Sequence, residues 1–137
     1  MTSRMTGGWA FRIKNRAKDG REVVELLDPL VWGVEGHDGP TFITVPQGFE
    51  SDFASIPWLA RRSLPSFGPW ARAAVLHDWL YLTKGDGGRW TRKQADDFFM
   101  QAMLATAEDR EDKQPDRFTR GLIHRAVRAF GAGGWGT

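Results

Sequence analysis

The run AAVLHDWLY, residues 73–81, combines helix-forming apolar residues with a histidine, a carboxylate and a tyrosine. On a helix, His77 and Tyr81 lie one turn apart on a shared face, and Asp78 is turned by about 100° from them. The apolar neighbours make a charge here costly unless it is paired or used. This run therefore predicts a buried helix with a titratable base on one face and an oxygen ligand on another.

A second segment supplies a partner for the histidine. Asp96 lies in QADDFF, residues 94–99, which continues into a helical apolar stripe. We expect Asp96 to lie within hydrogen-bonding distance of His77, with Tyr81 on the same carboxylate, because a general base needs its tautomer fixed by a third group. Asp97, rotated by about 100°, should be the more exposed of the two aspartates. The alternative is a buried histidine that a carboxylate merely satisfies.

Outward from these two segments, the first half of the chain has β patterning and the second half has α patterning. Alternating apolar residues around the turn signal Asp19-Gly20 predict a hairpin, and two further strands follow it. Pro69 and the capping box formed by Thr91 and Gln94 mark helix starts. The expected strands cover residues 9–14, 21–27, 30–35 and 41–45, and the expected helices cover about 69–82, the segment from Thr91 onward and about 117–130.

These elements indicate an α+β fold, with a small antiparallel sheet from the first 45 residues packed beside three helices. We expect a single domain over residues 1–130, with a long irregular loop at 46–66 and a frayed glycine-rich tail at 131–137. On the third helix the apolar periodicity predicts an inner and an outer face. Leu122, Ile123, Ala126, Val127 and Phe130 should face the core, and Arg117, Arg120, His124 and Arg128 should face solvent.

Composition excludes several classes of chemistry. The 137-residue chain contains no cysteine, which rules out disulfides, thiol catalysis and thiolate zinc sites. Its formal net charge of +2 does not argue for specific nucleic-acid binding. There is no apolar run long enough for a bilayer and no leader-like N-terminus, so we expect neither a transmembrane segment nor a signal peptide.

Residues 73–81 and 95–99 resemble the His-Asp-x-x-Tyr and Ala-Asp-x-x-Phe elements of phospholipase A₂, especially the cysteine-free form in parvovirus capsid proteins. The resemblance spans roughly residues 66–104. It implies that His77 activates the attacking water and that Asp96 holds the imidazole. It also implies that Tyr81 supports that aspartate and that Asp78 binds calcium.

The calcium implied by this resemblance needs further ligands. The family's glycine-rich calcium loop lies well upstream of its histidine, whereas residues 66–69 here lie too close to His77. Calcium takes six to eight oxygens, which Asp78 alone does not provide. Either the segment 48–55 supplies the rest, with Asp52 as a second carboxylate, or the metal has been lost. For Asp52, a turn-stabilising role and a metal-ligating role both remain open.

A second resemblance covers more of the chain. The motifs VPxGFxSDFASIP from residue 45, HDxLY from residue 77 and ADxxF from residue 95 are similar to an uncharacterised domain family of tailed bacteriophages and prophages. This resemblance extends from about residue 40 to Gly131. It implies a phage gene product of virion or late-gene context, located in the virion or in the host cytoplasm.

Together the resemblances favour a phage-encoded phospholipase A₂-like hydrolase with a His–Asp dyad. A non-catalytic virion protein of the tail or head–tail joint and another metal-dependent hydrolase of the cell envelope are the alternatives. The expected partners are virion proteins or host membrane lipid, with Trp58, Trp70 and Arg61-Arg62 as a candidate docking surface. Solvent access to His77 separates the hydrolase from the non-catalytic virion protein. A hydrolase needs His77 in a cleft, whereas a structural protein would bury it.

Overall fold

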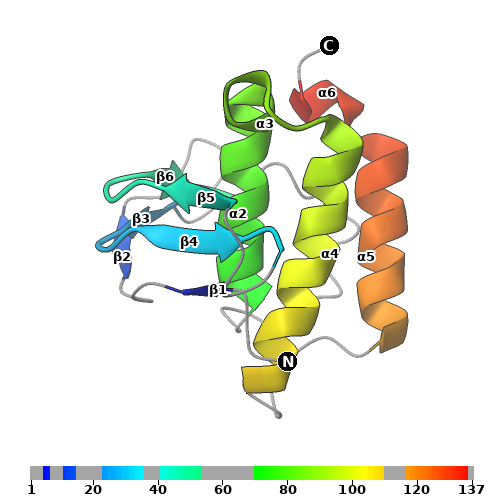
Figure 1. The fold of residues 1–137 in the computed structure, drawn as a ribbon, viewed down its shortest axis with the longest axis horizontal. Helices are drawn as coiled ribbons and strands as arrows, with labels where there is room; N and C mark the ends of the chain where they lie inside the picture. The colour runs from blue at the N-terminus through cyan, green and yellow to red at the C-terminus, as the bar shows by residue number, and fades with distance from the viewer. Residues whose placement is uncertain are drawn as a thin grey trace.

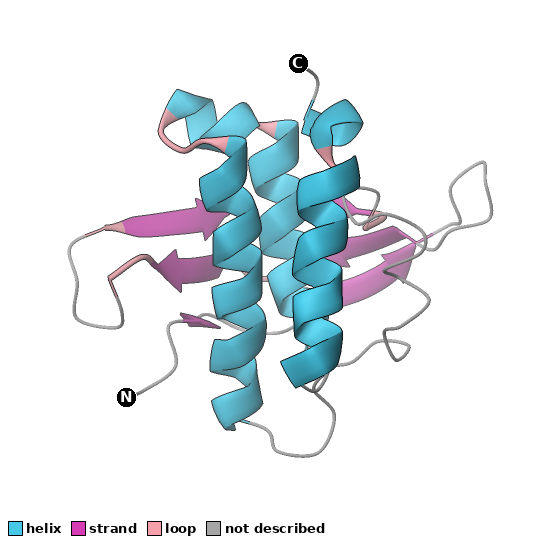
Figure 2. Cartoon of the chain, turned by 90° about the vertical axis from the view of Figure 1, so that its right-hand side faces the viewer, coloured by secondary structure: helices cyan, strands magenta, loops and turns pink. Residues whose placement is uncertain are grey.

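The computed structural model describes residues 5–6, 11–14, 23–35, 41–53, 70–109 and 117–135. Short strands lie on one side of helix α2, and helices α4 and α5 lie on the other (Figure 1). Seen from the helical side, α4 and α5 run next to each other in front of α2 (Figure 2). The predicted α+β class is confirmed.

The described strands form two small antiparallel sheets, where one sheet was predicted. The first has the order β1-β4-β5 and the second the order β2-β3-β6. The predicted hairpin is present as β2 and β3, with Arg12 opposite Glu25. The strands are β1 (Met5–Thr6), β2 (Phe11–Lys14), β3 (Val23–Leu26), β4 (Leu30–Gly33), β5 (Phe42–Val45) and β6 (Glu50–Ser51).

Strand β6 corrects the prediction that residues 46–66 are irregular throughout. It has only two residues, too few for a period-2 pattern, and it is recognisable only through its pairing with β3. In this pairing Ser51 lies opposite Val24 and is buried. Strand β6 thereby brings a polar side chain to the interior beside α2.

Helix α2 (Trp70–Leu82) is buried on almost every side, because it lies between the strands and α4 (Arg92–Asp109). Ala71, Ala73 and Ala74 leave room for these neighbours. The largest fully buried side chains come from the strands, from α2 itself and from α4 and α5: Leu26, Leu30, Trp32, Ile43, Leu76, Leu80, Phe99, Met103 and Ile123. An all-round buried helix of this kind explains why a histidine on it meets protein on each side.

The start of α4 follows the predicted capping box. The Thr91 backbone N–H donates to Gln94 Oε1 at 2.9 Å, and the Gln94 N–H donates to Thr91 Oγ1 at 3.1 Å. The Trp90 ring packs edge-on against Phe98, with 5.1 Å between the ring centroids. Because the cap fixes where the helix begins, it also fixes the face on which Asp96 lies.

The C-terminal helices differ from the prediction in two respects. Helix α5 (Arg117–Phe130) buries Ile123 and Val127 as expected, but Leu122 and Phe130 are 42% and 69% exposed. Residues 132–135, expected to be frayed, form the short helix α6 (Ala132–Trp135). The Trp135 ring packs edge-on against Tyr81 at 5.2 Å, which holds this segment on the end of α2.

Between α2 and α4 the chain makes an unusual left-handed turn, α3 (Lys84–Gly88). All five residues have positive φ, including the non-glycine residues Lys84 at 53° and Asp86 at 58°. The Thr83 hydroxyl accepts from the Asp86 N–H at 2.9 Å, and Arg89 donates to the Asp86 carboxylate at 2.8 Å. The predicted glycine break is therefore an ordered turn that sets the spacing of the two helices.

We expect Gly85→Ala to lower the free energy of unfolding by about 2–4 kcal/mol, because a left-handed φ and overpacking add together. A Cβ on Gly85 would lie 1.8 Å from the Trp90 carbonyl oxygen, whereas one on Gly87 would meet nothing within 4 Å. Gly87→Ala should therefore cost only about 1–2 kcal/mol, the left-handed cost alone. Urea unfolding of the two variants provides the comparison, and equal losses would contradict the steric account.

Candidate functional site

The centre of the site is a hydrogen-bonded group formed by α2 and α4. His77 Nε2 lies 2.7 Å from Asp96 Oδ1, and the Tyr81 hydroxyl donates to the same oxygen at 2.6 Å. His77 and Asp96 have no exposed surface, and Tyr81 is 3% exposed. The helical spacing therefore predicted correctly that His77 and Tyr81 share a face and meet Asp96 from the second helix.

The second oxygen of Asp96 has partners that sequence reasoning missed. Arg128 of α5 donates to Asp96 Oδ2 at 2.8 Å, and the Arg92 guanidinium lies 3.5 Å from the same oxygen. Arg128 was expected to face solvent, but its side chain is only 33% exposed. The only available signal was that Arg92 lies four residues before Asp96 on one helix, a spacing typical of an ion pair.

The charge of Asp96 and the tautomer of His77 follow from these contacts. Burial raises the pKa of Asp96, but hydrogen bonds from His77, Tyr81 and Arg128 outweigh it, so the pKa lies below the ordinary value. Asp96 is therefore ionised at neutral pH and accepts hydrogen bonds only. Nε2 of His77 must then carry the proton and donate to Asp96, so Nδ1 is the ring nitrogen that this contact leaves to other partners. Burial and the bond to Asp96 raise the pKa of Tyr81, so its hydroxyl stays protonated.

Asp78 lies on a different side of α2 from His77. The Ser51 hydroxyl of β6 donates to Asp78 Oδ2, and the Phe53 N–H donates to Ser51 Oγ at 3.2 Å. Phe53 has a left-handed φ of 61°, a strained conformation that this serine helps to hold. Because of the 100° offset between them, His77 contacts Asp96 of α4 and Asp78 contacts Ser51 of β6.

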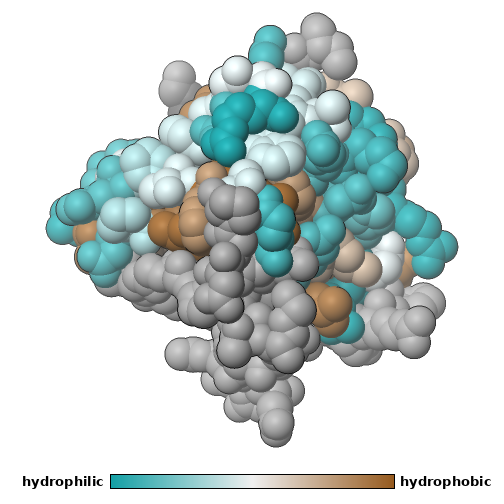
Figure 3. Space-filling view, in the orientation of Figure 1, coloured by the Kyte–Doolittle hydropathy of each residue, from teal (hydrophilic) through white to brown (hydrophobic). Residues whose placement is uncertain are grey.

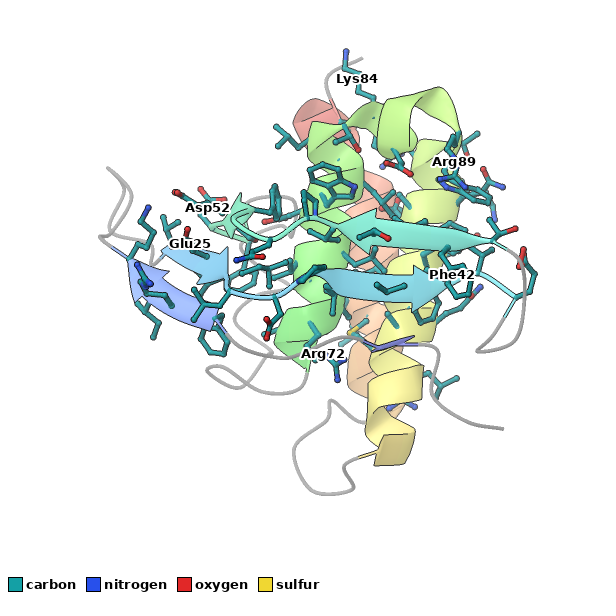
Figure 4. All side chains as sticks on the ribbon, turned by 60° about the vertical axis from the view of Figure 1, so that its left-hand side comes forward. Glu25, Phe42, Asp52, Arg72, Lys84 and Arg89 are labelled. Carbon is teal, nitrogen blue, oxygen red and sulfur yellow. The ribbon has the colours of Figure 1, made fainter. Side chains whose placement is uncertain are left out.

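The two expected metal ligands, Asp78 and Asp52, lie on α2 and beside β6. Within the described ranges, no group of three or more His, Asp or Glu side chains gathers where it could hold a metal. Figure 4 shows Asp52 beside β6, the strand whose Ser51 donates to Asp78. Calcium requires six to eight oxygens, so a site here would need further oxygens besides these two carboxylates.

Asp97 forms a second, outer His–Asp pair. His124 Nε2 lies 2.8 Å from Asp97 Oδ1, and Lys93 donates to Asp97 Oδ2 at 2.8 Å. The Asp97 side chain is 32% exposed and that of Asp96 is fully buried, as the helical offset predicted. Burial raises the pKa of Asp97, but the contacts with Lys93 and His124 outweigh it, and the pKa lies below its ordinary value.

The surroundings of His77 are closed. Its ring packs against Tyr81 at 4.3 Å and Phe99 at 4.7 Å between centroids. With no exposed surface, His77 does not line the open cleft that a hydrolase was expected to have. Substrate access would thus require an opening of the structure around the imidazole.

The surface has polar and apolar parts. Hydrophilic side chains cover the helices on the right of the face in Figure 3, with smaller apolar areas near the strands.

The candidate docking residues Trp58 and Arg61-Arg62, and the side chain of Trp70, lie outside the described residues. Among the described helices, none combines the length and apolarity of a membrane span.

Acid should unfold the protein partly through Asp96. Its pKa is lowered on folding, so it stabilises the fold above its unfolded value of about 4 and loses this contribution as pH falls through the folded pKa. The stability difference between wild type and Asp96→Asn should therefore be large at pH 7 and shrink steadily below about pH 4. Urea midpoints from about pH 7 down to about pH 2.5 test this, and a pH-independent difference would contradict it.

A family model described as a protein of unknown function, DUF1353, matches residues 25–127. This span contains Asp96 and Asp97 of α4, His77, Tyr81 and most of α5. Comparisons with curated proteins and with solved structures find no significant match. The expectation of an uncharacterised domain family is met, and the phage association and the likeness to phospholipase A₂ stay predictions.

Proposed function

We propose that this chain, which belongs to the DUF1353 family of proteins of unknown function, is a phospholipase A₂-like ester hydrolase. His77 is the general base, and Asp96 and Tyr81 orient it. The observation that carries the proposal is the 2.7 Å contact between His77 Nε2 and an Asp96 oxygen that also accepts from Tyr81 at 2.6 Å. A phage-encoded, virion-associated enzyme is the context we propose for this activity.

The chemistry follows from the tautomer. With the proton on Nε2, Nδ1 removes a proton from water as the water oxygen bonds to the ester carbonyl carbon. The carbonyl then reforms as the carbon–oxygen bond to the leaving alcohol breaks, and the imidazolium returns its proton to that alcohol. Asp96 stabilises the imidazolium through its negative charge and keeps Nε2 as the donor.

Burial of the site supports the proposal in one respect and constrains it in another. In a low-dielectric site the Asp96–imidazolium attraction is stronger than in water. However, His77 has no exposed surface, so the proposed reaction requires that the structure open when substrate arrives. A lipid surface is the substrate form that we propose as the trigger.

A second candidate function is favoured by the same burial. A non-catalytic virion component would keep His77 and Asp96 as a sealed polar core, with both carboxylate oxygens occupied and Asp78 bonded to Ser51. A buried polar network destabilises the fold when some of its groups lack hydrogen-bond partners. Here each carboxylate oxygen of Asp96 has a partner. In this role the network would specify how α2, α4 and α5 pack.

Lipid hydrolysis tests the first function. The purified chain is mixed with vesicles of phosphatidylcholine and phosphatidylglycerol, in millimolar calcium and in chelator, and products are identified by mass spectrometry. We expect one fatty acid and one lysophospholipid per ester cleaved, and the calcium arm measures any metal requirement. If neither arm releases fatty acid above a protein-free blank, the hydrolase proposal fails.

Acylation of histidine by diethyl pyrocarbonate separates the two candidates. His124 is partly exposed and serves as the internal control, since it should react with or without lipid. For a hydrolase, vesicles should increase the modification of His77, whereas a sealed scaffold should protect His77 equally in both conditions.

A further inference from the structure

The Asp96 carboxylate is held from two directions. Oδ1 faces His77 and Tyr81 on α2, and Oδ2 faces Arg128 on α5 and Arg92 on its own helix. Rotation of the carboxylate about its Cβ–Cγ bond would break contacts on both oxygens at once. The orientation of Asp96 towards His77 thus depends on two arginines as well as on α2.

The two arginines also tie α4 and α5 together reciprocally. Arg92 donates from Nη1 to the Val127 carbonyl at 3.1 Å and from Nη2 to the Arg128 carbonyl at 3.2 Å. These carbonyls lie in the last turn of α5, and the Val127 carbonyl also accepts from the Gly131 N–H at 2.9 Å. Arg128, whose own carbonyl Arg92 binds, reaches back to Asp96. Each helix therefore supplies one arginine to the other.

Gly131 shows how closely this junction is packed. It is buried, and a Cβ there would lie 2.5 Å from the Tyr81 hydroxyl, 2.4 Å from the Val127 oxygen and 3.2 Å from Arg92 Nη1. The end of α5 is therefore in direct contact with the hydroxyl that shares Asp96 with His77. A shift of α5 would reach the dyad through three contacts: Arg128, Arg92 and the backbone at Gly131.

We infer that Arg128 and Arg92 are positioning residues, which hold the Asp96 carboxylate in the orientation that fixes His77. They act on the imidazole through Asp96. This inference rests on the proposed function in that the orientation matters chemically only when His77 is the base. Docking of α5 on α4 thereby becomes a condition for an oriented base.

The two arginines depend to different degrees on the several donors of the guanidinium group. Arg92 uses two guanidinium nitrogens for two carbonyls while one of them also faces Asp96, an arrangement that a lysine does not reproduce. Arg128 reaches Asp96 through Nη1, so lysine at this position retains the charge and part of the contact. Arg128→Lys should consequently be an intermediate case, and Arg128→Met a full loss.

The test measures the tautomer of the His77 ring and the solvent exchange of its ring proton. Nitrogen-15 NMR of the histidine rings reports which nitrogen carries the proton, and His77→Gln identifies the His77 signals. In wild type we expect a single Nε2–H tautomer with a protected ring proton. In Arg128→Met the ring proton should exchange with solvent at least about 10-fold faster, because a charged hydrogen bond that orients its acceptor is lost. Arg128→Lys should restore part of the protection.

Arg125→Met is the matched control, since Arg125 is exposed on the same helix and is not part of the network. Its ring signals should equal those of wild type. If Arg128→Met is folded by its amide spectrum and its His77 signals are also unchanged, the inference is overturned. Should Arg128→Met fail to fold, Arg128→Lys decides by the same readout, with unchanged protection counting against the inference.

Hydrolysis provides an independent readout. If the proposed function holds, Arg128→Met should lower kcat by about 10- to 100-fold with little change in KM, the pattern of a lost supporting contact. A changed ring signal with no hydrolysis by wild type would retain the positioning role and remove the proposed function. If wild type is active and Arg128→Met has an unchanged kcat, the proposed function is retained and the positioning role is removed.

Discussion

Asp96→Asn is expected to lower the free energy of unfolding by about 3–5 kcal/mol, because it removes the charge from a buried, paired carboxylate. The amide is nearly isosteric, so the loss comes from electrostatics and hydrogen bonding rather than from a cavity. Its NH₂ group would place donors against the donors of either His77 and Tyr81 or Arg128. The Arg128 and Arg92 cations would also lose their shared anion.

Asp97→Asn is the matched control on the neighbouring residue. Its carboxylate also holds a histidine and a cation, but its side chain is 32% exposed, so the change should cost less than about 1 kcal/mol. Denaturant unfolding of both variants at neutral pH gives the comparison. Similar losses at the two positions would show that burial of the Asp96 network contributes nothing special to stability.

The sequence predicted the part of the site that local periodicity determines. The spacing of His77 and Tyr81 placed them on one face, and the capping box at Thr91 set the start of the helix that carries Asp96. Whether Asp96 or Asp97 faced inward then followed from the offset of about 100° between consecutive residues. These relations lie within single helices, and the order of the residues along the chain is enough to determine them.

What the sequence could not supply are relations between distant elements. The partners of Asp96 on α5 depend on how that helix is rotated, and apolar periodicity alone assigned Arg128 to solvent and Phe130 to the core. Phe130 is instead 69% exposed, and Gly131 occupies the place beside Tyr81 where no side chain fits. The contact of Ser51 with Asp78 depends on a two-residue strand with no pattern of its own.

His77→Gln should lower the rate of ester hydrolysis by about 10²- to 10⁴-fold, the usual effect of losing a general base. Glutamine can keep a hydrogen bond to Asp96, so the fold should survive, but it has no lone pair basic enough to take a proton from water. The effect should appear in kcat, because the proposed role of His77 is in the chemical step. Circular dichroism and the unfolding midpoint verify that the variant is folded.

The most direct measurement compares fatty-acid release from phospholipid vesicles by wild type, His77→Gln and His124→Gln at equal folded concentration. His124 is the matched control, because it forms the outer pair with Asp97 and has no proposed role in the reaction. The account predicts hydrolysis by wild type, near-equal hydrolysis by His124→Gln, and a loss of about 10²-fold or more in His77→Gln. Hydrolysis by His77→Gln at the wild-type rate, or none by folded wild type on any lipid tested, would contradict the assignment of His77 as a catalytic base.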